Sequence, residues 1–328
     1  MNKFKYYFIV IITSLSIFSC SKDDNTVEAE PLRDFQDQFT DDNTTIEEYL
    51  KSYYIDVVDA PGQPEDQDVV FTKIPAGGSQ PSIWTYLNKS TFPKLLQKSV
   101  ELHDITYTVY YLVLREGSGE KPCNVDGVLT SYRGQYLHKS TVNEVTTLTP
   151  TQFEEVKYPE SFFSLTGVIT GWSEIFPQFK VGTAVSNGDG TVTYNNFGAG
   201  VMFLPSGLAY YSSGSGSIPS YTPLVFSFKL YALKRVDNDG DGIPSYLEDL
   251  NGDGYLRTVA TTNTPLEDSD ADGVPDFLDI DDDGDGFTTK IELKKPDGSY
   301  HTFETVPSCS GQTTKRYLNA NCKPPYLD

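Results

Sequence analysis

Residues 163–174 read Phe-Ser-Leu-Thr-Gly-Val-Ile-Thr-Gly-Trp-Ser-Glu, and they decide which fold is expected. On its own, a Val-Ile-x-Gly-Trp stretch is typical of a strand that enters a helix and places its tryptophan in the core. Three flanking runs, 103–115, 125–132 and 224–230, are rich in β-branched and aromatic residues and predict strands. Arg133-Gly134 predicts a turn after the second run. We therefore expect an antiparallel sheet around this stretch.

The composition limits the possible functions. The 328 residues include 25 Lys and Arg against 46 Asp and Glu, and the resulting net charge of −21 excludes nucleic acid as a partner. With 22 Tyr, 19 Phe, 20 Pro and 26 Gly, strands and turns are favoured over long helices. His103, His138 and His301 are far apart in the sequence, which gives little support to histidine-rich metal sites or Ser/His/Asp catalysis.

Two further segments complete a recognisable pattern. Residues 203–210 read Phe-Leu-Pro-Ser-Gly-Leu-Ala-Tyr, and a Ser/Gly-rich loop then leads to Ser217-Ile218-Pro219. Together with residues 163–174, and in this order, they resemble the FKBP family of peptidyl-prolyl cis-trans isomerases over about residues 105–235. The resemblance implies an α+β fold in which an antiparallel sheet wraps a short helix, with Pro-x-x-Leu-Ala-Tyr as one of its strands.

The resemblance also implies a peptide-binding pocket. Trp172 would form its floor, the Ile169 N–H would be available to the peptide, and the Tyr210 hydroxyl would meet a substrate carbonyl. The residues implied as catalytic or lining are Tyr132, Phe163, Val168, Ile169, Trp172, Tyr210, Ile218 and Phe226.

Such a pocket suits prolyl isomerisation on physical grounds. Rotation about an X-Pro amide crosses a barrier of about 18–20 kcal/mol, and the twisted state is less polar than the planar one. An apolar site that desolvates the amide and holds the proline ring favours the twisted state without an acid, a base or a nucleophile.

Some family features are not found where the pattern predicts them. About ten residues after its first-strand tyrosine the family has Phe-Asp, whereas Thr141-Val142-Asn143-Glu144 follow Tyr132 here. Val142 would fill part of the wall, and Asn143 would replace the aspartate as a hydrogen-bonding group. Tyr211 stands where the family usually has Gly, and an insertion at 187–190 lengthens a hairpin. An FKBP-like fold kept only for binding is therefore an alternative.

The N-terminus reads as an export signal. Residues 1–19 have a basic start and an apolar run too short to span a membrane, and Ile17-Phe18-Ser19-Cys20 resembles a bacterial lipobox with Cys20 as the lipidated residue. The following Ser-Lys-Asp-Asp resembles the surface-export signal of Bacteroidetes lipoproteins, although an acidic linker explains it equally well. We expect residues 20–45 to be a disordered tether and the protein to be an outer membrane lipoprotein on the periplasmic or cell-surface face.

The remaining regions outside the sheet are assigned from spacing. Residues 46–54 show helical periodicity and open an N-terminal helical or irregular region, 46–104. Cys309 and Cys322 are expected to pair in the C-terminal tail, 294–328, because an exported chain permits disulfides. Cys123 is then a buried free thiol.

An acidic segment follows the FKBP-like region. Residues 237–292 hold 17 Asp or Glu against two basic residues. Loops 237–248, 268–279 and 281–292 fit the spacing D-x-D-x-D-G with an acid at position 12, and loop 249–260 fits it in part, with Ala260 at position 12. The expected metal ligands are Asp237, Asp239, Asp241, Glu248, Asp268, Asp270, Asp272, Asp279, Asp281, Asp283, Asp285 and Glu292.

These oxygen ligands favour structural calcium. The glycine at position 6 permits the turn that lets the carboxylates converge, and a flexible carboxylate shell suits Ca²⁺ better than Mg²⁺. Pro244 and Pro275 at position 8 disfavour the second helix of an EF-hand, so residues 236–293 resemble thrombospondin type 3 calcium repeats instead. A merely solvated acidic tail is the alternative.

The expected protein is a lipid-anchored prolyl isomerase that acts on proline-containing segments of exported proteins. The competing hypothesis is a non-catalytic surface module that binds a peptide or small ligand and is made rigid by calcium.

Overall fold

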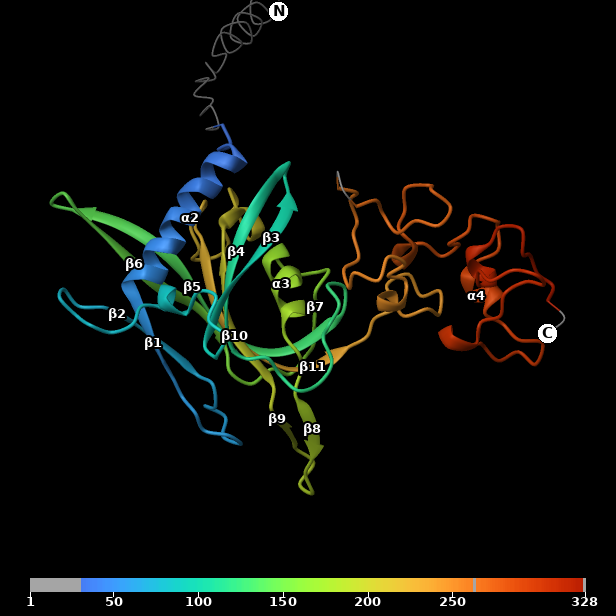
Figure 1. The fold of residues 1–328 in the computed structure, drawn as a ribbon, viewed down its shortest axis with the longest axis horizontal. Helices are drawn as coiled ribbons and strands as arrows, with labels where there is room; N and C mark the ends of the chain where they lie inside the picture. Colours follow the sequence, from blue (N-terminus) through green and yellow to red (C-terminus); the bar gives the residue numbers. More distant parts are fainter. Residues whose placement is uncertain (1–30, 262–263, 327–328) are drawn as a thin grey trace, which may run out of the picture. The chain divides into compact units, whose positions relative to one another are not determined.

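The computed structural model describes residues 31–261 and 264–326. Its largest element is a seven-stranded sheet in the order β3-β4-β10-β11-β5-β6, with β7 paired to β5 (Figure 1). All of its pairings are antiparallel, as the sequence predicts. Its strands are β3 (Lys94–Leu102), β4 (Ile105–Arg115), β5 (Gly127–Val142), β6 (Val145–Val156), β7 (Phe163–Ser164), β10 (Gly198–Leu204) and β11 (Leu224–Lys234).

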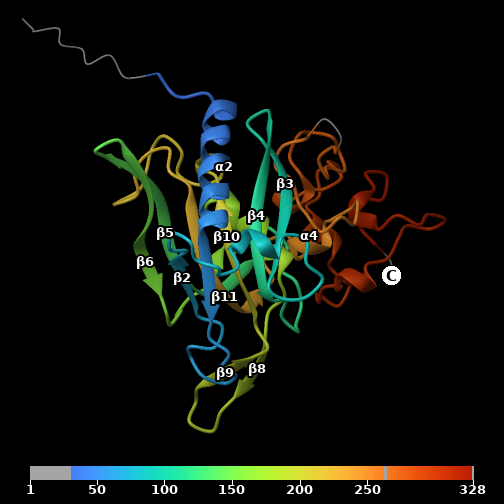
Figure 2. The same ribbon diagram turned by 60° about the vertical axis from the view of Figure 1, so that its left-hand side comes forward.

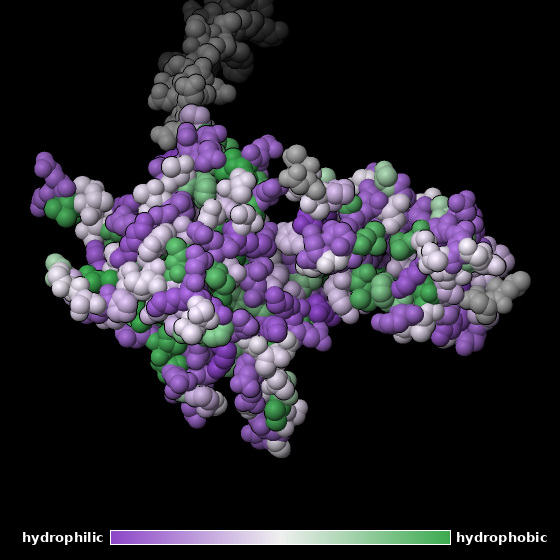
Figure 3. Space-filling model, in the orientation of Figure 1, coloured by the Kyte–Doolittle hydropathy of each residue, from purple (hydrophilic) through white to green (hydrophobic). Residues whose placement is uncertain are grey.

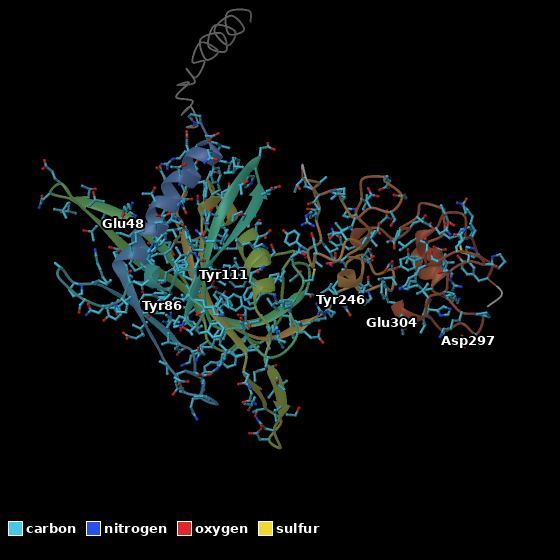
Figure 4. The ribbon with its side chains drawn as sticks, in the orientation of Figure 1. Glu48, Tyr86, Tyr111, Tyr246, Asp297 and Glu304 are labelled. Atoms are coloured by element: carbon cyan, nitrogen blue, oxygen red, sulfur yellow. A yellow bond between two sulfur atoms is a disulfide. The ribbon has the colours of Figure 1, made fainter. Side chains whose placement is uncertain are left out.

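The sheet is buried on both faces, which explains why its strands read as nearly continuous apolar runs. Successive side chains of a strand point to opposite faces. In β4, Tyr107 and Tyr111 join the core cluster that contains Trp172, whereas Tyr110 and Leu112 join a second cluster on the other face. Figure 4 labels Tyr111 within the body of the sheet domain.

One face is covered by the short helix α3 (Thr170–Ile175), in agreement with a sheet wrapped on a short helix. Trp172 and Ile175 are the buried apolar residues of α3 and pack into the first cluster. Gly171 allows the close approach, because a Cβ atom there would lie 2.5 Å from the Leu204 side chain of β10.

The other face is covered by α2 (Phe35–Ser52), which runs along the sheet in Figure 2. Ile46, Tyr49 and Leu50 are fully buried in the second cluster. Tyr53 and Tyr54, which the helical periodicity includes, instead begin β1 (Tyr53–Val57), and β1 pairs with β2 (Val69–Lys73).

The expected disorder up to residue 45 is wrong for its last part. The helix begins at Phe35, after Asp34 accepts hydrogen bonds from the N–H groups of Gln36 and Asp37. The composition of this part is acidic, but Phe39 packs against the first cluster and the buried Asp42 bonds to Ser206. These long-range contacts order a segment that cannot order itself. The signal peptide and Cys20 lie outside the described residues.

The sheet domain also begins earlier than residue 105. β3 starts at Lys94 and pairs with β4 along its whole length, so part of the region 46–104 belongs to the sheet. This boundary was missed because a strand at the edge of the sheet, with only Leu95 and Val100 buried, has a weak apolar pattern.

The expected turn at Arg133-Gly134 is wrong. β5 continues to Val142, and Asn143 and Glu144, with φ of 48° and 65°, make the turn into β6. Two consecutive positive φ angles are typical of a two-residue hairpin turn. By contrast, the insertion at 187–190 does join a hairpin, formed by β8 (Thr183–Ser186) and β9 (Val192–Asn195).

The C-terminal part consists of loops and short helical turns, with α4 (Thr289–Glu292) as its one α-helix within the described range. The Cys309–Cys322 disulfide and the buried free thiol of Cys123 are confirmed. On the face drawn in Figure 3, hydrophilic residues predominate and apolar residues form small separate groups. Among the described helices, none has the length and apolar character that a membrane span requires.

Candidate functional site

Five aromatic rings meet where α3 faces the sheet. The ring centroid of Trp172 lies 4.9 Å from Tyr132, 5.3 Å from Phe226 and 5.6 Å from Phe163. Phe153 lies edge-on to Phe226 at 5.7 Å. We call Tyr132, Phe153, Phe163, Trp172 and Phe226 the aromatic cluster. Edge-to-face contacts at these distances hold the rings in fixed orientations.

The structure brings all eight sequence-predicted residues into the same apolar cluster. Four of them are buried and four are half-buried. The buried ones are Tyr132, Ile218, Trp172 and Phe226, and the half-buried ones are Phe163, Val168, Ile169 and Tyr210. The half-buried set supplies apolar surface that a ligand can reach. Tyr210 lies in a turn after the helical turn Ser206–Leu208, so the strand expected for this segment is wrong.

Three hydrogen-bond donors of this site make no hydrogen bond within the described part of the chain. They are the backbone N–H of Ile169, the Tyr210 hydroxyl and the indole N–H of Trp172, which is buried. A buried donor without a partner costs about 1–3 kcal/mol. A peptide carbonyl that approaches the cluster can accept a hydrogen bond from the Ile169 N–H or the Tyr210 hydroxyl.

An aromatic residue and an acid lie beside the cluster, farther along the chain than the family spacing predicts. Phe153 packs on Phe226, and the Glu154 carboxylate lies close enough to Tyr132 to affect its pKa. Burial, followed by this carboxylate, raises the pKa of Tyr132 well above its usual value. Phe153 and Glu154 therefore place an aromatic ring and an acid beside Phe226 and Tyr132, the two kinds of group that the resemblance implies.

Val142 and Asn143 do not take these roles. Val142 is 67% exposed, and Asn143 lies at the tip of the β5–β6 hairpin. Both residues therefore face solvent and do not line the aromatic cluster. The long hairpin separates Tyr132 from Phe153 by 21 residues (153 − 132), about twice the family spacing. The adjacent Phe153 and Glu154, an aromatic residue followed directly by an acid, were the sequence signal that could have identified the pair.

A β-bulge and a glycine place Phe153 in the cluster. The pairing of β5 with β6 shifts between Gly134 and Gln135, so Phe153 has no direct partner across the ladder. A Cβ atom on Gly134 would lie 2.4 Å from the tip of the Phe153 ring, which means that the end of the ring lies against the glycine. Bulges commonly redirect a side chain in this way.

The acidic segment, residues 237–292, contains four loops with the same local structure. They are the first loop (237–248), the second (249–260), the third (268–279) and the fourth (281–292). In each, a carboxylate oxygen at position 1 accepts a hydrogen bond from the N–H of the glycine at position 6, at 3.1, 2.7, 2.9 and 3.0 Å respectively. That glycine has a φ between 79° and 108° in all four. The partial second loop thus folds like the three complete ones.

Carboxylates converge in every loop. In the first, third and fourth loops the acids at positions 1, 3 and 5 place one oxygen each within 4.8 Å of one another. In the second loop the third member of the group is Glu267, which replaces the acid missing at position 12. Glu267 was not predicted, because it lies seven residues beyond the end of the motif (267 − 260).

The acids at position 12 differ in their environment. Glu248 groups with Asp241, and Glu292 is buried with one oxygen lacking a hydrogen-bond partner among the described residues. Burial raises the pKa of Glu292 to about 8. Asp279 does not join the group of the third loop, and its carboxylate instead accepts the N–H of Asp281. Its proposed role as a ligand therefore lacks geometric support.

The second loop also contacts the sheet domain, and a cavity of about 980 Å³ lies beside this contact. The Asn124 side chain accepts from the N–H of Leu256 at 2.8 Å and donates to its carbonyl at 2.7 Å. The Tyr255 hydroxyl donates to Glu174 of α3, which is also paired with Lys98 at 2.6 Å. The cavity shares Val168 with the predicted site but is lined by polar groups of both regions rather than by the aromatic cluster.

Sequence comparison agrees with the geometry of the aromatic cluster. The chain is 33% identical over 134 residues to an FKBP-type peptidyl-prolyl cis-trans isomerase, FkpA, of Aeromonas hydrophila. This chain is similar to FKBP-type prolyl isomerases. The match spans 40% of this chain and 40% of the Aeromonas protein, so most of that relative lies outside it.

Two solved structures are also similar. A peptidyl-prolyl cis-trans isomerase of Pseudomonas syringae pv. tomato is 17% identical with a TM-score of 0.32, over 62% of this chain and 99% of the other. FkpA of Escherichia coli is 28% identical with a TM-score of 0.28, over 39% of this chain and 48% of the other.

The acidic segment matches a different family. A sequence model described as BamM C-terminal matches residues 238–316, less than half of the chain. It includes nearly all of the four loops and extends past Cys309. The family matched is not the thrombospondin type 3 repeat, so that resemblance rests on residue spacing alone.

Proposed function

We propose that this protein is a peptidyl-prolyl cis-trans isomerase that acts on proline-containing segments of exported proteins. The observation that carries the proposal is the aromatic cluster bordered by three donors, on Ile169, Trp172 and Tyr210, that lack hydrogen-bond partners among the described residues. Similarity to FKBP-type isomerases over 134 residues supports the same reaction.

The cluster supplies what the reaction requires. The half-buried Phe163, Val168 and Ile169 can desolvate a proline ring and its amide, while the free donors hold the flanking carbonyls. A twisted amide has lost its resonance and is less polar than a planar one, so this environment favours the transition state over the ground state. Tyr132 and Trp172 keep the walls in place through the edge-to-face contact.

The non-catalytic alternative rests on the absence of the family's Phe-Asp pair shortly after Tyr132. The positions of Phe153 and Glu154 beside the cluster support the catalytic proposal over this alternative. The refolding experiment below tests this non-catalytic alternative as well.

A refolding assay tests the activity. Proline-limited refolding takes tens of seconds without a catalyst, so acceleration by the full chain is readily measured. Trp172→Ala should reduce the acceleration about tenfold or more, and Tyr210→Phe by about twofold to tenfold, the effect of one hydrogen bond. Trp84→Ala and Tyr194→Phe, which lie outside the cluster, are the matched controls. Folded wild-type protein that leaves the slow phase unchanged would instead support the binding module.

We further propose that calcium occupies the acidic loops as a structural ion. The converging carboxylates and their unpartnered buried oxygens support a hard divalent cation bound by oxygen. Affinities as weak as roughly 0.1–1 mM would suffice outside the cell.

The proposed location is the outer membrane, with lipid attached to Cys20, on its periplasmic or cell-surface face. The lipobox-like residues 17–20 support it. Several acyl chains anchor a protein firmly, whereas one chain anchors it only marginally. Mass spectrometry of the mature N-terminus should find lipidated Cys20, and Cys20→Ser should abolish membrane association. A mature N-terminus at another residue would exclude this anchor.

A further inference from the structure

Three carboxylates from two different loops meet inside the acidic segment. Asp241 and Glu248 belong to the first loop, and Asp282 belongs to the fourth. One carboxylate oxygen of each lies within 4.8 Å of the others. All three residues are buried, with exposed fractions of 2%, 2% and 1%.

Asp282 has no place in the binding pattern of its own loop. It occupies position 2, where the other three loops have Asn238, Leu250 and Ser269. Its N–H donates a hydrogen bond to Thr289 Oγ1 at position 9 of the fourth loop. In the third loop, the N–H of Ser269 at position 2 likewise donates to Asp276 at position 9. The backbone at position 2 is therefore ordinary, and only the carboxylate is unusual.

Five of the six carboxylate oxygens of this group lack hydrogen-bond donors within the described residues, and the sixth, Oδ1 of Asp241, accepts from the N–H of Ile243. Both carboxylate oxygens of Glu248 and of Asp282, and Oδ2 of Asp241, have no hydrogen-bond partner there. Lys290 is the nearby cation, but its ammonium donates to the Gly240 carbonyl at 3.0 Å.

Three buried anions at this separation need a compensating positive charge. Removing a carboxylate from water costs several kcal/mol, and like charges in a medium of low dielectric repel one another. A divalent cation between them removes both costs, and it gains oxygen ligands that no other group uses. Asp239, whose Oδ2 is also unpartnered in this part of the structure, lies beside them in the first loop.

We propose that Asp282 is a ligand of the calcium ion held by the first loop, so that one ion joins the first and fourth loops. This inference rests on the proposed occupancy of the loops by calcium. The first loop alone would supply acids at positions 1, 3, 5 and 12, and Asp282 adds a carboxylate from 34 residues farther on (282 − 248). The ion then acts as a cross-link between segments, and its binding energy stabilises their packing.

The cross-link has a mechanical consequence for the segment. The first loop cannot bind its ion at full affinity until the fourth loop is in place. Loss of this ion should therefore loosen both loops together, although the fourth loop keeps its own acids Asp281, Asp283 and Asp285.

Calcium titration of the full chain by isothermal calorimetry tests the assignment. Asp282→Asn and Glu248→Gln should each weaken one ion by about tenfold or more. The double variant should still affect only one ion, because both acids serve it. Asp282→Asn combined with Asp283→Asn should affect two ions, since Asp283 serves the fourth loop. Glu304→Gln, which removes an exposed acid outside the loops, should bind like wild type (Figure 4).

A thermal readout separates a ligand from a merely structural residue. With chelator, Asp282→Asn should raise the melting temperature above that of wild type, because one of three buried like charges is gone. With calcium, the same variant should have a lower melting temperature than wild type. If Asp282 only forms hydrogen bonds, Asp282→Asn should melt at a lower temperature than wild type both with chelator and with calcium. This result would overturn the proposal.

Two calorimetric outcomes would also overturn it. One is wild-type affinity in Asp282→Asn, and the other is the loss of two ions in the variant that combines Asp282→Asn with Glu248→Gln. Wild-type protein that takes up no calcium would overturn this inference together with the proposed calcium loops, and it would leave the refolding assay for isomerase activity unaffected.

Discussion

Asp42 of α2 accepts hydrogen bonds from both the backbone N–H and the hydroxyl of Ser206, at 2.7 and 2.6 Å. Ser206 begins the helical turn that leads to Tyr210, so this carboxylate connects the N-terminal helix to one edge of the candidate site. Burial raises the pKa of Asp42 from 3.8 to about 6, although the hydrogen bonds from Ser206 oppose the rise.

The raised pKa gives a prediction for stability against pH. A carboxyl whose pKa is higher in the folded state stabilises the fold below pH 3.8 and loses this contribution as the pH rises through about 6. The unfolding free energy of wild type minus that of Asp42→Asn should therefore fall by up to about 3 kcal/mol between pH 4 and 7. Urea unfolding across this range measures it. Asp41→Asn, at the exposed neighbouring acid, is the matched control, and a difference for Asp42→Asn that does not change with pH would contradict the prediction.

Gly134→Ala should displace Phe153 from the aromatic cluster. The new methyl group would collide with the Phe153 ring, which can move because it is the end of a side chain. We expect a loss of about 1–3 kcal/mol of stability and a weaker acceleration of prolyl refolding. Gly127→Ala is the control on the same strand, since a Cβ atom there meets its nearest neighbour at 3.4 Å. Equal behaviour of the two variants would show that Gly134 has no special role in placing Phe153.

Glu154→Gln should reduce isomerase activity with little effect on folding. We expect the Glu154 carboxylate to orient Tyr132 through a hydrogen bond, which the change would weaken, and Glu154 itself is exposed. An exposed hydrogen bond of this kind contributes about 0.5–1.5 kcal/mol, so the rate should fall by about twofold to tenfold. Glu155→Gln removes the neighbouring acid, which pairs with Arg133 at 2.9 Å, and should leave the rate unchanged. If both variants match wild type, Tyr132 needs no acid to hold it.

Chelation of calcium should expose residues 237–292 to proteases before the sheet domain. Without cations, 17 acids face two basic residues, and their repulsion expands the loops. Limited proteolysis followed by mass spectrometry should locate new cuts in this segment. Trp172 fluorescence should stay unchanged, because the aromatic cluster belongs to a separate core. Added calcium, but not an equal concentration of magnesium, should restore protection. Cleavage that is the same with and without chelator would favour the solvated acidic tail.

Local chemistry explains what the sequence by itself determined. The four acidic loops could be predicted because each depends on hydrogen bonds between residues at most five positions apart, such as Asp237 and Gly242. The Val-Ile-Thr-Gly-Trp stretch also identified its surroundings, since Gly171 and Trp172 combine close helix-to-sheet approach with a large apolar side chain. The antiparallel sheet followed from strands with strong β-branched and aromatic patterns.

Tertiary contacts decided the rest, because they join residues that are distant in sequence. Gly134 suggested a turn, yet it makes room for Phe153 across two paired strands. The acidic start of α2 suggested disorder, but Asp42 finds its partner 164 residues later in Ser206. Asp282 fits no motif position and gains a potential role only when the fourth loop packs on Glu248 of the first. In each case the deciding energy comes from burial against a remote segment, which no local pattern encodes.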